Sequence, residues 1–189
     1  LTQFLYLCAE FHIKIFIMNE QKNFIEKEDV VVKFVGDSGD GMQLAGTLFS
    51  DAAALQGLDL ATFPDYPAEI RAPHNTIAGV SGFQVHVGRK KIDTTGDSVD
   101  ILVAMNPASL KSNLKWTRPG ATLIVDTDTF DEAAIKKAGY DSNPLEDGSL
   151  SGYNLVKAPV TMLTRAALQP LGFDNKNADR TRNVFTLGI

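Results

Sequence analysis

The residues best suited to chemistry fall in one short glycine-rich segment that follows an apolar run. The segment reads GDSGDG and comprises Gly36, Asp37, Ser38, Gly39, Asp40 and Gly41. Glycines permit a tight turn and a close backbone approach, and unpaired N–H groups at a helix start attract an anion. These six residues are therefore candidates for cofactor binding. Their spacing, G-x-x-G-x-G, is neither the dinucleotide fingerprint nor a phosphate loop.

The two aspartates of this segment leave a second interpretation open. Two carboxylates beside a pyrophosphate would repel it, whereas carboxylates at a helix N-terminus stabilise the helix by about 0.3–1 kcal/mol each. The segment would then be a structural turn that supplies its own helix caps. A simple NAD site is disfavoured under both interpretations.

Polar residues also follow two apolar runs further along the chain. Asn106 comes directly after DILVAM, and Asp126 and Asp128 end ATLIVDTD. Asn106 is a candidate cofactor-binding residue because ligands of open parallel sheets bind at the carboxyl ends of the strands. It is equally suited to cap the helix that Pro107 begins. For the two aspartates, capping of the helix that follows is favoured over acid–base or metal chemistry.

A proline-rich segment, FPDYPAEIRAPHNT, cannot form a regular helix. Long loops in compact domains are usually functional or interfacial. Its notable members are Tyr66, Glu69 and Arg71. Because Arg offers a planar, bidentate contact to an anion and Tyr an anchor, we predict a loop that faces a partner or substrate. The alternative is an exposed Glu69–Arg71 pair of little consequence.

A complete reaction centre is not visible in the sequence. The only cysteine is Cys8 and the three histidines are scattered, which supports no nucleophile and no zinc or iron–sulfur site. We predict no catalytic residue and no metal site in this chain. The net charge of −5, from 18 basic and 23 acidic residues, disfavours nucleic acid and anionic membranes as partners. The lack of a disulfide framework predicts a reduced, cytoplasmic setting.

Apolar runs alternate with amphipathic segments along most of the chain. We predict strands at 30–35, 58–63, 79–87, 91–94, 100–105, 121–128 and 153–160. Predicted helices cover 42–57, 106–115, 130–139 and 161–172, and a further one starts at Asn177. This alternation predicts an α/β, Rossmann-like fold with a mainly parallel sheet, helices on both faces, and an antiparallel pair at 79–94.

Residues 1–17 differ in composition from the rest. They are apolar but interrupted by charges, so they match neither a signal peptide nor a transmembrane helix. We expect an upstream extension without a role, with Met18 as the natural start; an added edge strand is the alternative. Residues 18–189 are predicted to form one domain, and the apolar, uncapped stretch before Ile189 suggests a truncated C-terminus.

Three ordered motifs carry a family resemblance. GDSGDGMQLAGTLF, FPDYPAEIRAP and TIAGVSGFQVHVG follow one another, with ILVAMNP and RNVFTLG later in the chain. Together they resemble the γ domain of the 2-oxoacid:ferredoxin oxidoreductases. The likeness is greatest to the N-terminal part of the large subunit of the 2-oxoglutarate enzymes.

The resemblance implies a part of an enzyme that has no turnover by itself. In that family thiamine diphosphate with Mg, held between α and β domains, runs the oxidative decarboxylation of a 2-oxoacid. Electrons reach ferredoxin through iron–sulfur clusters, and coenzyme A, on the γ side, takes the acyl group. Partner α and β domains are thus expected, and no firmly bound cofactor in this chain alone. The alternatives are a free-standing nucleotide or coenzyme A binding module, or a purely structural assembly domain.

Overall fold

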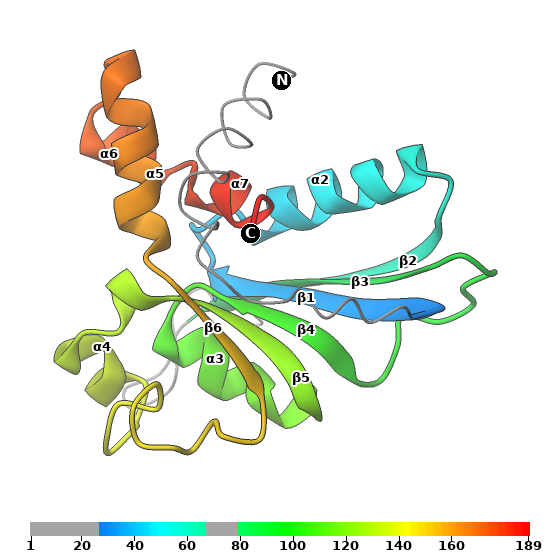
Figure 1. Cartoon of the computed structure of the whole chain (residues 1–189), viewed down its shortest axis with the longest axis horizontal. Helices are drawn as coiled ribbons and strands as arrows, with labels where there is room; N and C mark the ends of the chain where they lie inside the picture. The colour runs from blue at the N-terminus through cyan, green and yellow to red at the C-terminus, as the bar shows by residue number, and fades with distance from the viewer. Residues whose placement is uncertain (1–26, 67–78) are drawn as a thin grey trace, which may run out of the picture.

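The computed structural model describes residues 27–66 and 79–189. The predicted extension at 1–17, Glu69 and Arg71 lie outside the described residues. Six strands form one sheet in the order β2-β3-β1-β4-β5-β6 (Figure 1). The strands are β1 (Asp29–Asp37), β2 (Asp59–Asp65), β3 (Val80–Gly88), β4 (Val99–Ala104), β5 (Thr117–Asp126) and β6 (Asn154–Ala158).

The sheet is mixed and mostly parallel. β1, β4, β5 and β6 run in one direction, and β3 runs antiparallel to both of its neighbours, β1 and β2. Because β2 is antiparallel to β3, β2 runs in the same direction as β1. The predicted α/β class and the mainly parallel sheet are confirmed.

The prediction that 79–87 and 91–94 form an antiparallel pair is wrong, because β3 pairs with β1 and β2 instead. Residues 91–94 form no strand, because β1 and β2 already occupy both hydrogen-bonding edges of β3. The segment after β3 instead folds back and accepts hydrogen bonds from strand side chains. Gln84 Nε2 donates to the carbonyls of Thr95 at 2.7 Å and Gly96 at 2.8 Å.

Helices cover both faces of the sheet, as predicted (Figure 1). On one side lie α2 (Met42–Leu55), α5 (Val160–Leu168), α6 (Asn175–Asp179) and α7 (Arg182–Thr186), and on the other α3 (Pro107–Asn113) and α4 (Glu132–Lys137). Short 3-10 turns occupy Leu114–Trp116, Thr127–Thr129 and Gln169–Leu171.

The central strand β1 is buried on both faces. Val31 and Val35 belong to the apolar cluster that includes side chains of α3 and α4. Val32 and Phe34 belong to the cluster formed with α2 and α7. A strand covered on both sides requires a mostly apolar run, as in VVVKFV, where the one charged residue, Lys33, pairs with Asp65.

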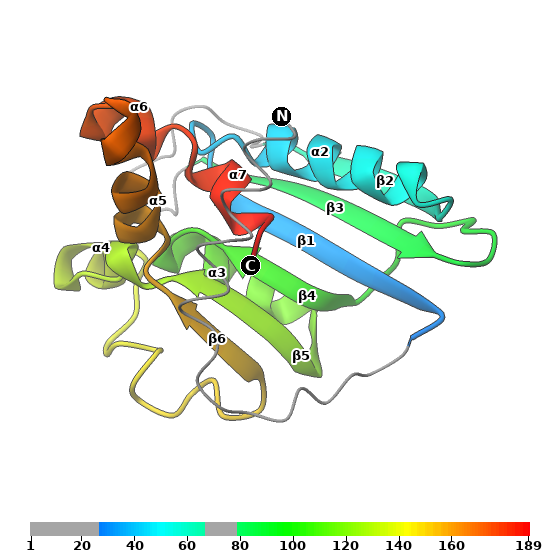
Figure 2. The same ribbon diagram turned by 45° about the horizontal axis from the view of Figure 1, so that its top comes forward.

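The C-terminal segment differs from the single helix predicted from Asn177. The chain forms two short helices, α6 and α7, with a break at Arg180 and Thr181. α7 lies between α2 and α5 in both views (Figures 1 and 2). This break turns α7 toward the start of α2. Among the described residues, the helices are too short and too polar to cross a membrane.

Candidate functional site at the carboxyl edge of the sheet

The glycine-rich segment and Asn106 meet where the chain divides between the two faces of the sheet. After β1 the chain enters α2 on one face, and after the neighbouring β4 it enters α3 on the other. The Asn106 Nδ2 atom donates to Asp37 Oδ1 at 3.0 Å, although the two residues are 69 positions apart. Such a switch point is the usual place for ligands in open α/β sheets.

The segment from Gly36 to Gly41 forms a closed, self-bonded turn, which we call the glycine loop. The Asp40 N–H donates to the Asp37 carbonyl at 2.9 Å, and the Asp37 N–H donates to Asp40 Oδ2 at 2.9 Å. Gly41 has φ of 72°, a left-handed conformation that favours glycine. Around a Cβ built on Gly39, no atom of the described residues lies within 4 Å apart from those of its two neighbours in the chain. The loop is therefore tight at Gly41 and open at Gly39.

No carboxylate of the described residues caps the N-terminus of α2. Within the described part of the chain, no side chain caps it, and its first turn has no acidic residue. The predicted turn with self-supplied caps is thus half right: Asp40 closes the turn, but neither aspartate caps α2. The unpaired N–H groups keep their partial positive charge for another acceptor.

Asn106 does cap its helix. Its side-chain oxygen accepts a hydrogen bond from the Ser109 N–H at 2.8 Å, and the Ser109 hydroxyl oxygen accepts one from the Asn106 N–H at 3.3 Å. The capping interpretation is confirmed, and the same side chain uses its amide nitrogen for Asp37. Any role in cofactor binding stays a prediction.

Asp126 and Asp128 also act as caps, but of a different helix from the one predicted. The Thr161 N–H donates to Asp126 Oδ1 at 3.4 Å, and the Met162 N–H donates to Asp128 Oδ2 at 2.7 Å. Both donors belong to α5, whereas α4 is capped by Asp131. The reason is topological, because β6 lies beside β5 and delivers the start of α5 to the end of β5.

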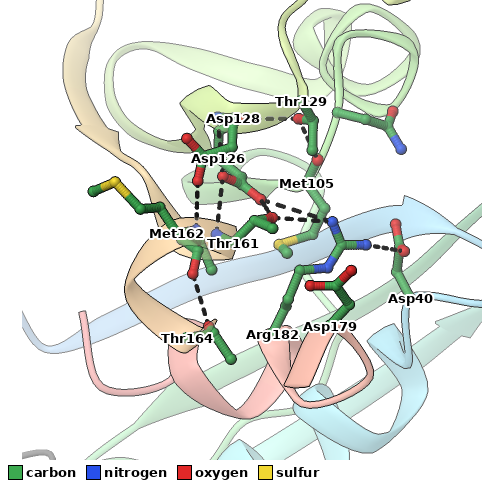
Figure 3. Close-up of polar contacts among 12 residues, drawn as sticks. Asp40, Met105, Asp126, Asp128, Thr129, Thr161, Met162, Thr164, Asp179 and Arg182 are labelled. Atoms are coloured by element: carbon green, nitrogen blue, oxygen red, sulfur yellow. Dashed lines mark hydrogen bonds and ion pairs between the residues drawn. The ribbon is translucent and has the colours of Figure 1, made fainter. Parts of the chain in front are cut away.

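Sequence reasoning missed Arg182, which joins these parts (Figure 3). Its Nη2 contacts Asp40 Oδ1 at 2.8 Å, and its Nη1 donates to Thr161 Oγ1 at 3.2 Å and lies 3.9 Å from Asp126 Oδ2. Burial raises the pKa of Asp40, while the hydrogen bond from Asp37 and the charge of Arg182 oppose that rise. Burial also raises the pKa of Asp126, against the hydrogen bond from Thr161.

Asn183, the next residue, was missed as well. Its Nδ2 donates to the Gly41 carbonyl at 2.9 Å, and its side chain is buried. Both residues lie in the RNVFTLG motif, but nothing in their spacing marks them as contacts of a loop 142 positions away.

The proline-rich segment starts and returns at the same edge of the sheet. Asp65, at the end of β2, lies opposite Gly82, and Ser81 lies opposite Gly36. Tyr66, the first residue after β2, is exposed over 67% of its surface. Its expected role at a partner surface stays a prediction, as do those of Glu69 and Arg71.

The site can bind and orient, but it offers little for bond-making chemistry. Among the described residues, no group of three His, Cys, Asp or Glu side chains could hold a metal ion. The carboxylates near the glycine loop are engaged by Arg182, by Asn106 or by backbone N–H groups. Within the part of the chain that the structure describes, the uncapped start of α2 and the space at Gly39 remain available.

A mixed sheet with a glycine loop at its switch point defines an α/β domain, and comparison with known proteins identifies its family. Residues 31–189 match the family described as pyruvate ferredoxin/flavodoxin oxidoreductase, and the chain belongs to that family.

Two relatives are subunits of 2-oxoglutarate enzymes. The chain is 49% identical over 162 residues to the 2-oxoglutarate oxidoreductase subunit KorA of Mycobacterium tuberculosis, covering 86% of this chain and 25% of the relative. It is 34% identical over 107 residues to the 2-oxoglutarate synthase subunit KorC of Methanothermobacter marburgensis, covering 56% of this chain and 54% of that one. The chain thus spans a quarter to about half the length of these relatives.

Solved structures agree with the fold. The 2-oxoglutarate:ferredoxin oxidoreductase from Magnetococcus marinus, with 2-oxoglutarate, coenzyme A and succinyl-CoA bound, aligns with a TM-score of 0.62 at 25% identity, over 84% of this chain and 23% of that one. The keto/oxoacid ferredoxin oxidoreductase γ subunit from Geobacter sulfurreducens aligns with a TM-score of 0.54 at 17% identity, over 86% and 95% of the two chains. The second likeness supports the fold alone.

Proposed function

We propose that this chain is the γ domain of a coenzyme A-dependent 2-oxoglutarate:ferredoxin oxidoreductase. The complete enzyme would decarboxylate 2-oxoglutarate oxidatively to an acyl-CoA in the cytoplasm and pass the electrons to ferredoxin. The observation that carries the proposal is the 49% identity to a 2-oxoglutarate oxidoreductase subunit over 86% of this chain. We assign residues 18–189 to this domain.

The proposal assigns the redox chemistry to partner α and β domains. The sole cysteine, Cys8, cannot supply the four thiolates of an iron–sulfur cluster. The described residues lack a carboxylate group suited to Mg. The proposal therefore places thiamine diphosphate with Mg and the iron–sulfur clusters in the partner domains, while the residues of this chain contribute binding and orientation.

The carboxyl edge of the sheet fits an anionic portion of coenzyme A better. The start of α2 presents uncapped N–H groups, and the space beside Gly39 is open. The repulsion expected from the loop carboxylates is reduced, because Asp40 is paired with Arg182 and Asp37 accepts from Asn106. An anion at a helix N-terminus needs these features.

The proline-rich loop is proposed to face a partner domain or the substrate side. Its two ends are fixed beside the glycine loop by the pairing of β2, β3 and β1. Arg71→Ala is expected to weaken assembly or coenzyme A-dependent turnover about tenfold while leaving the fold intact. Unchanged assembly and turnover would remove this loop from the interface.

The test of the function is a substrate panel with the complete enzyme. The full-length subunit and its β partner are produced together, and reduction of ferredoxin is followed with 2-oxoglutarate, pyruvate or 2-oxoisovalerate, with and without coenzyme A. We expect turnover that requires coenzyme A and is fastest with 2-oxoglutarate. Preference for another 2-oxoacid would correct the substrate, and the absence of coenzyme A-dependent turnover with all three would overturn the proposal.

The location of the anion is tested by a matched pair of variants at the open glycine. Gly39→Asp adds a negative charge where there is space for a side chain, and Gly39→Asn adds the same shape without charge. The aspartate variant is expected to raise the KM for coenzyme A about tenfold relative to the asparagine variant. Equal KM values for the two variants would place the anionic groups elsewhere.

A further inference from the structure

We infer that Arg182 is a positioning residue, which from the C-terminal helix α7 fixes the shape and the charge of the glycine loop for its anionic ligand. The inference rests on the proposed function of that loop. It concerns a residue far from the loop in sequence, because Arg182 and Asp40 are 142 positions apart.

The first argument is that Asp40 is held from two sides. Its Oδ1 lies 2.8 Å from Arg182 Nη2, and its Oδ2 accepts from the Asp37 N–H at 2.9 Å. Both partners of the ion pair are largely buried, with 20% of the Arg182 side chain and 15% of the Asp40 side chain exposed. Shielded pairs of this kind are screened by salt and water much less than pairs on the open surface.

The second argument is that the same helix also holds the following turn of the loop. Asn183 Nδ2 donates to the Gly41 carbonyl at 2.9 Å. A Cβ built on Gly41 would lie 2.5 Å from that nitrogen, so Asn183 fills the space that the glycine leaves. Two successive side chains of α7 therefore contact two successive residues of the loop.

The third argument concerns charge. Asp40 immediately precedes Gly41, the N-cap of α2, and an unpaired carboxylate there would compete with a bound anion for the helix N–H groups. Arg182 provides the positive charge that offsets it. The groups facing the guanidinium are Asp40, Asp126 and the Thr161 hydroxyl, and the charge of Asp179 also acts on it (Figure 3). Loss of Arg182 would leave two facing carboxylates without their cation.

The guanidinium is also fixed by residues outside the loop. Arg182 Nη1 donates to Thr161 Oγ1, whose hydroxyl donates to the buried Asp126 at 2.8 Å. Figure 3 shows these contacts reaching Arg182 from the last residue of β5 and from the first turn of α5. The position of Arg182, and with it that of Asp40 in the loop, is thus fixed by contacts with β5 and α5.

The experiment uses the complete enzyme and removes Arg182 with a matched control. Arg182→Met removes the cation and retains much of the aliphatic length, and Arg182→Lys retains the charge. The control is Lys90→Met, because Lys90 pairs with Glu28 at 2.9 Å through exposed side chains at the end of β1 and β3 opposite to the glycine loop. The measurements are the KM for coenzyme A, the KM for 2-oxoglutarate, and amide hydrogen exchange over 36–44.

We expect Arg182→Met to raise the KM for coenzyme A about tenfold or more, with the KM for 2-oxoglutarate unchanged, and to accelerate exchange in the loop. Arg182→Lys is expected to retain part of the affinity, and Lys90→Met to behave as wild type. Adding Asp40→Asn to Arg182→Met should recover much of the coenzyme A affinity, because it removes the carboxylate that the arginine offsets.

Three results would overturn the inference. One is unchanged loop exchange in Arg182→Met, and another is faster exchange with an unchanged KM for coenzyme A. The third is an equal rise in both KM values that Asp40→Asn does not reverse, which marks a merely structural residue. A wild-type enzyme without coenzyme A-dependent turnover refutes the proposed function and the ligand part of this inference, whereas the hydrogen-exchange comparison still decides the positioning part.

Discussion

Replacing Gly41 with alanine probes the glycine loop most directly, because two separate penalties coincide there. The backbone has φ of 72°, and a Cβ at this position would lie 2.5 Å from Asn183 Nδ2. Two other glycines separate the penalties. Gly57 has φ of 76° with no described atom within 4 Å of its Cβ position, and Gly39 has neither feature.

The expected magnitudes follow from these differences. A left-handed conformation costs an L-residue about 1–2 kcal/mol, from which the lower entropy of the unfolded alanine chain subtracts about 0.4–1 kcal/mol. Gly57→Ala should therefore lower the free energy of unfolding by about 1 kcal/mol or less. Gly41→Ala adds an overlap with Asn183, and overpacking of this kind costs about 1–3 kcal/mol more.

The assay is equilibrium unfolding in urea, with thermal melting as a second measure. A change of 1 kcal/mol shifts the Tm of a domain of this size by about 2–4 °C. Gly39→Ala should be neutral or slightly stabilising, and Gly41→Ala the most destabilised of the three. A double variant with Asn183→Ala should lose the overlap term, so the two changes should be less than additive. Equal losses at Gly41 and Gly57 would refute the close contact with Asn183.

Three further expectations concern stability. Burial by itself raises the pKa of Asp100, but Lys27 and the Val31 N–H lower that pKa below 3.8 overall. The ionised carboxylate therefore stabilises the fold above pH 3.8, and this stabilisation is lost as the pH falls through the lowered pKa of the folded protein. Asp100→Asn should lower the free energy of unfolding by about 1–3 kcal/mol at neutral pH and by progressively less in acid, as measured by urea titrations across pH. Asp65→Ala should lower the free energy of unfolding more than Lys33→Met, because only Asp65→Ala leaves the buried ammonium of Lys33 without this partner. A larger loss for Lys33→Met in chemical unfolding would contradict this expectation. Asn106→Ala should lower the free energy of unfolding by about 1 kcal/mol through loss of the helix cap, whereas Asn106→Ser should retain most of the cap without placing a second carboxylate beside Asp37; equal melting temperatures for the two variants would count against the capping role.

The sequence was informative wherever a contact depends on local pattern. The apolar run of β1, the glycine loop and the start of α2 are successive in the chain, so their types and spacing predict them directly. The contact of this loop with Asn106 is also predictable from the sequence, because both follow buried parallel strands whose carboxyl ends lie at one edge of the sheet.

Other parts depend on strand order, which spacing does not encode. The capping of α5 by Asp126 and Asp128 requires β6 to lie beside β5. The position of β3 between β1 and β2 leaves 91–94 without a strand to pair with. The contact of Arg182 with Asp40 joins residues 142 positions apart. In each case tertiary packing decided among locally reasonable alternatives.

The parallel course of β1 and β2 has a consequence for variation within the family. It brings both ends of the Tyr66–Gly79 connection to the edge of the sheet that carries the glycine loop, where Asp65 and Ser81 are fixed by strand pairing. The free energy of closing a loop grows slowly with its length, by about 0.6 kcal/mol for each doubling. Insertions and deletions between these fixed ends therefore disturb the sheet little. Differences among relatives in partner or substrate contacts are expected to accumulate in this connection while the strands that anchor it stay the same.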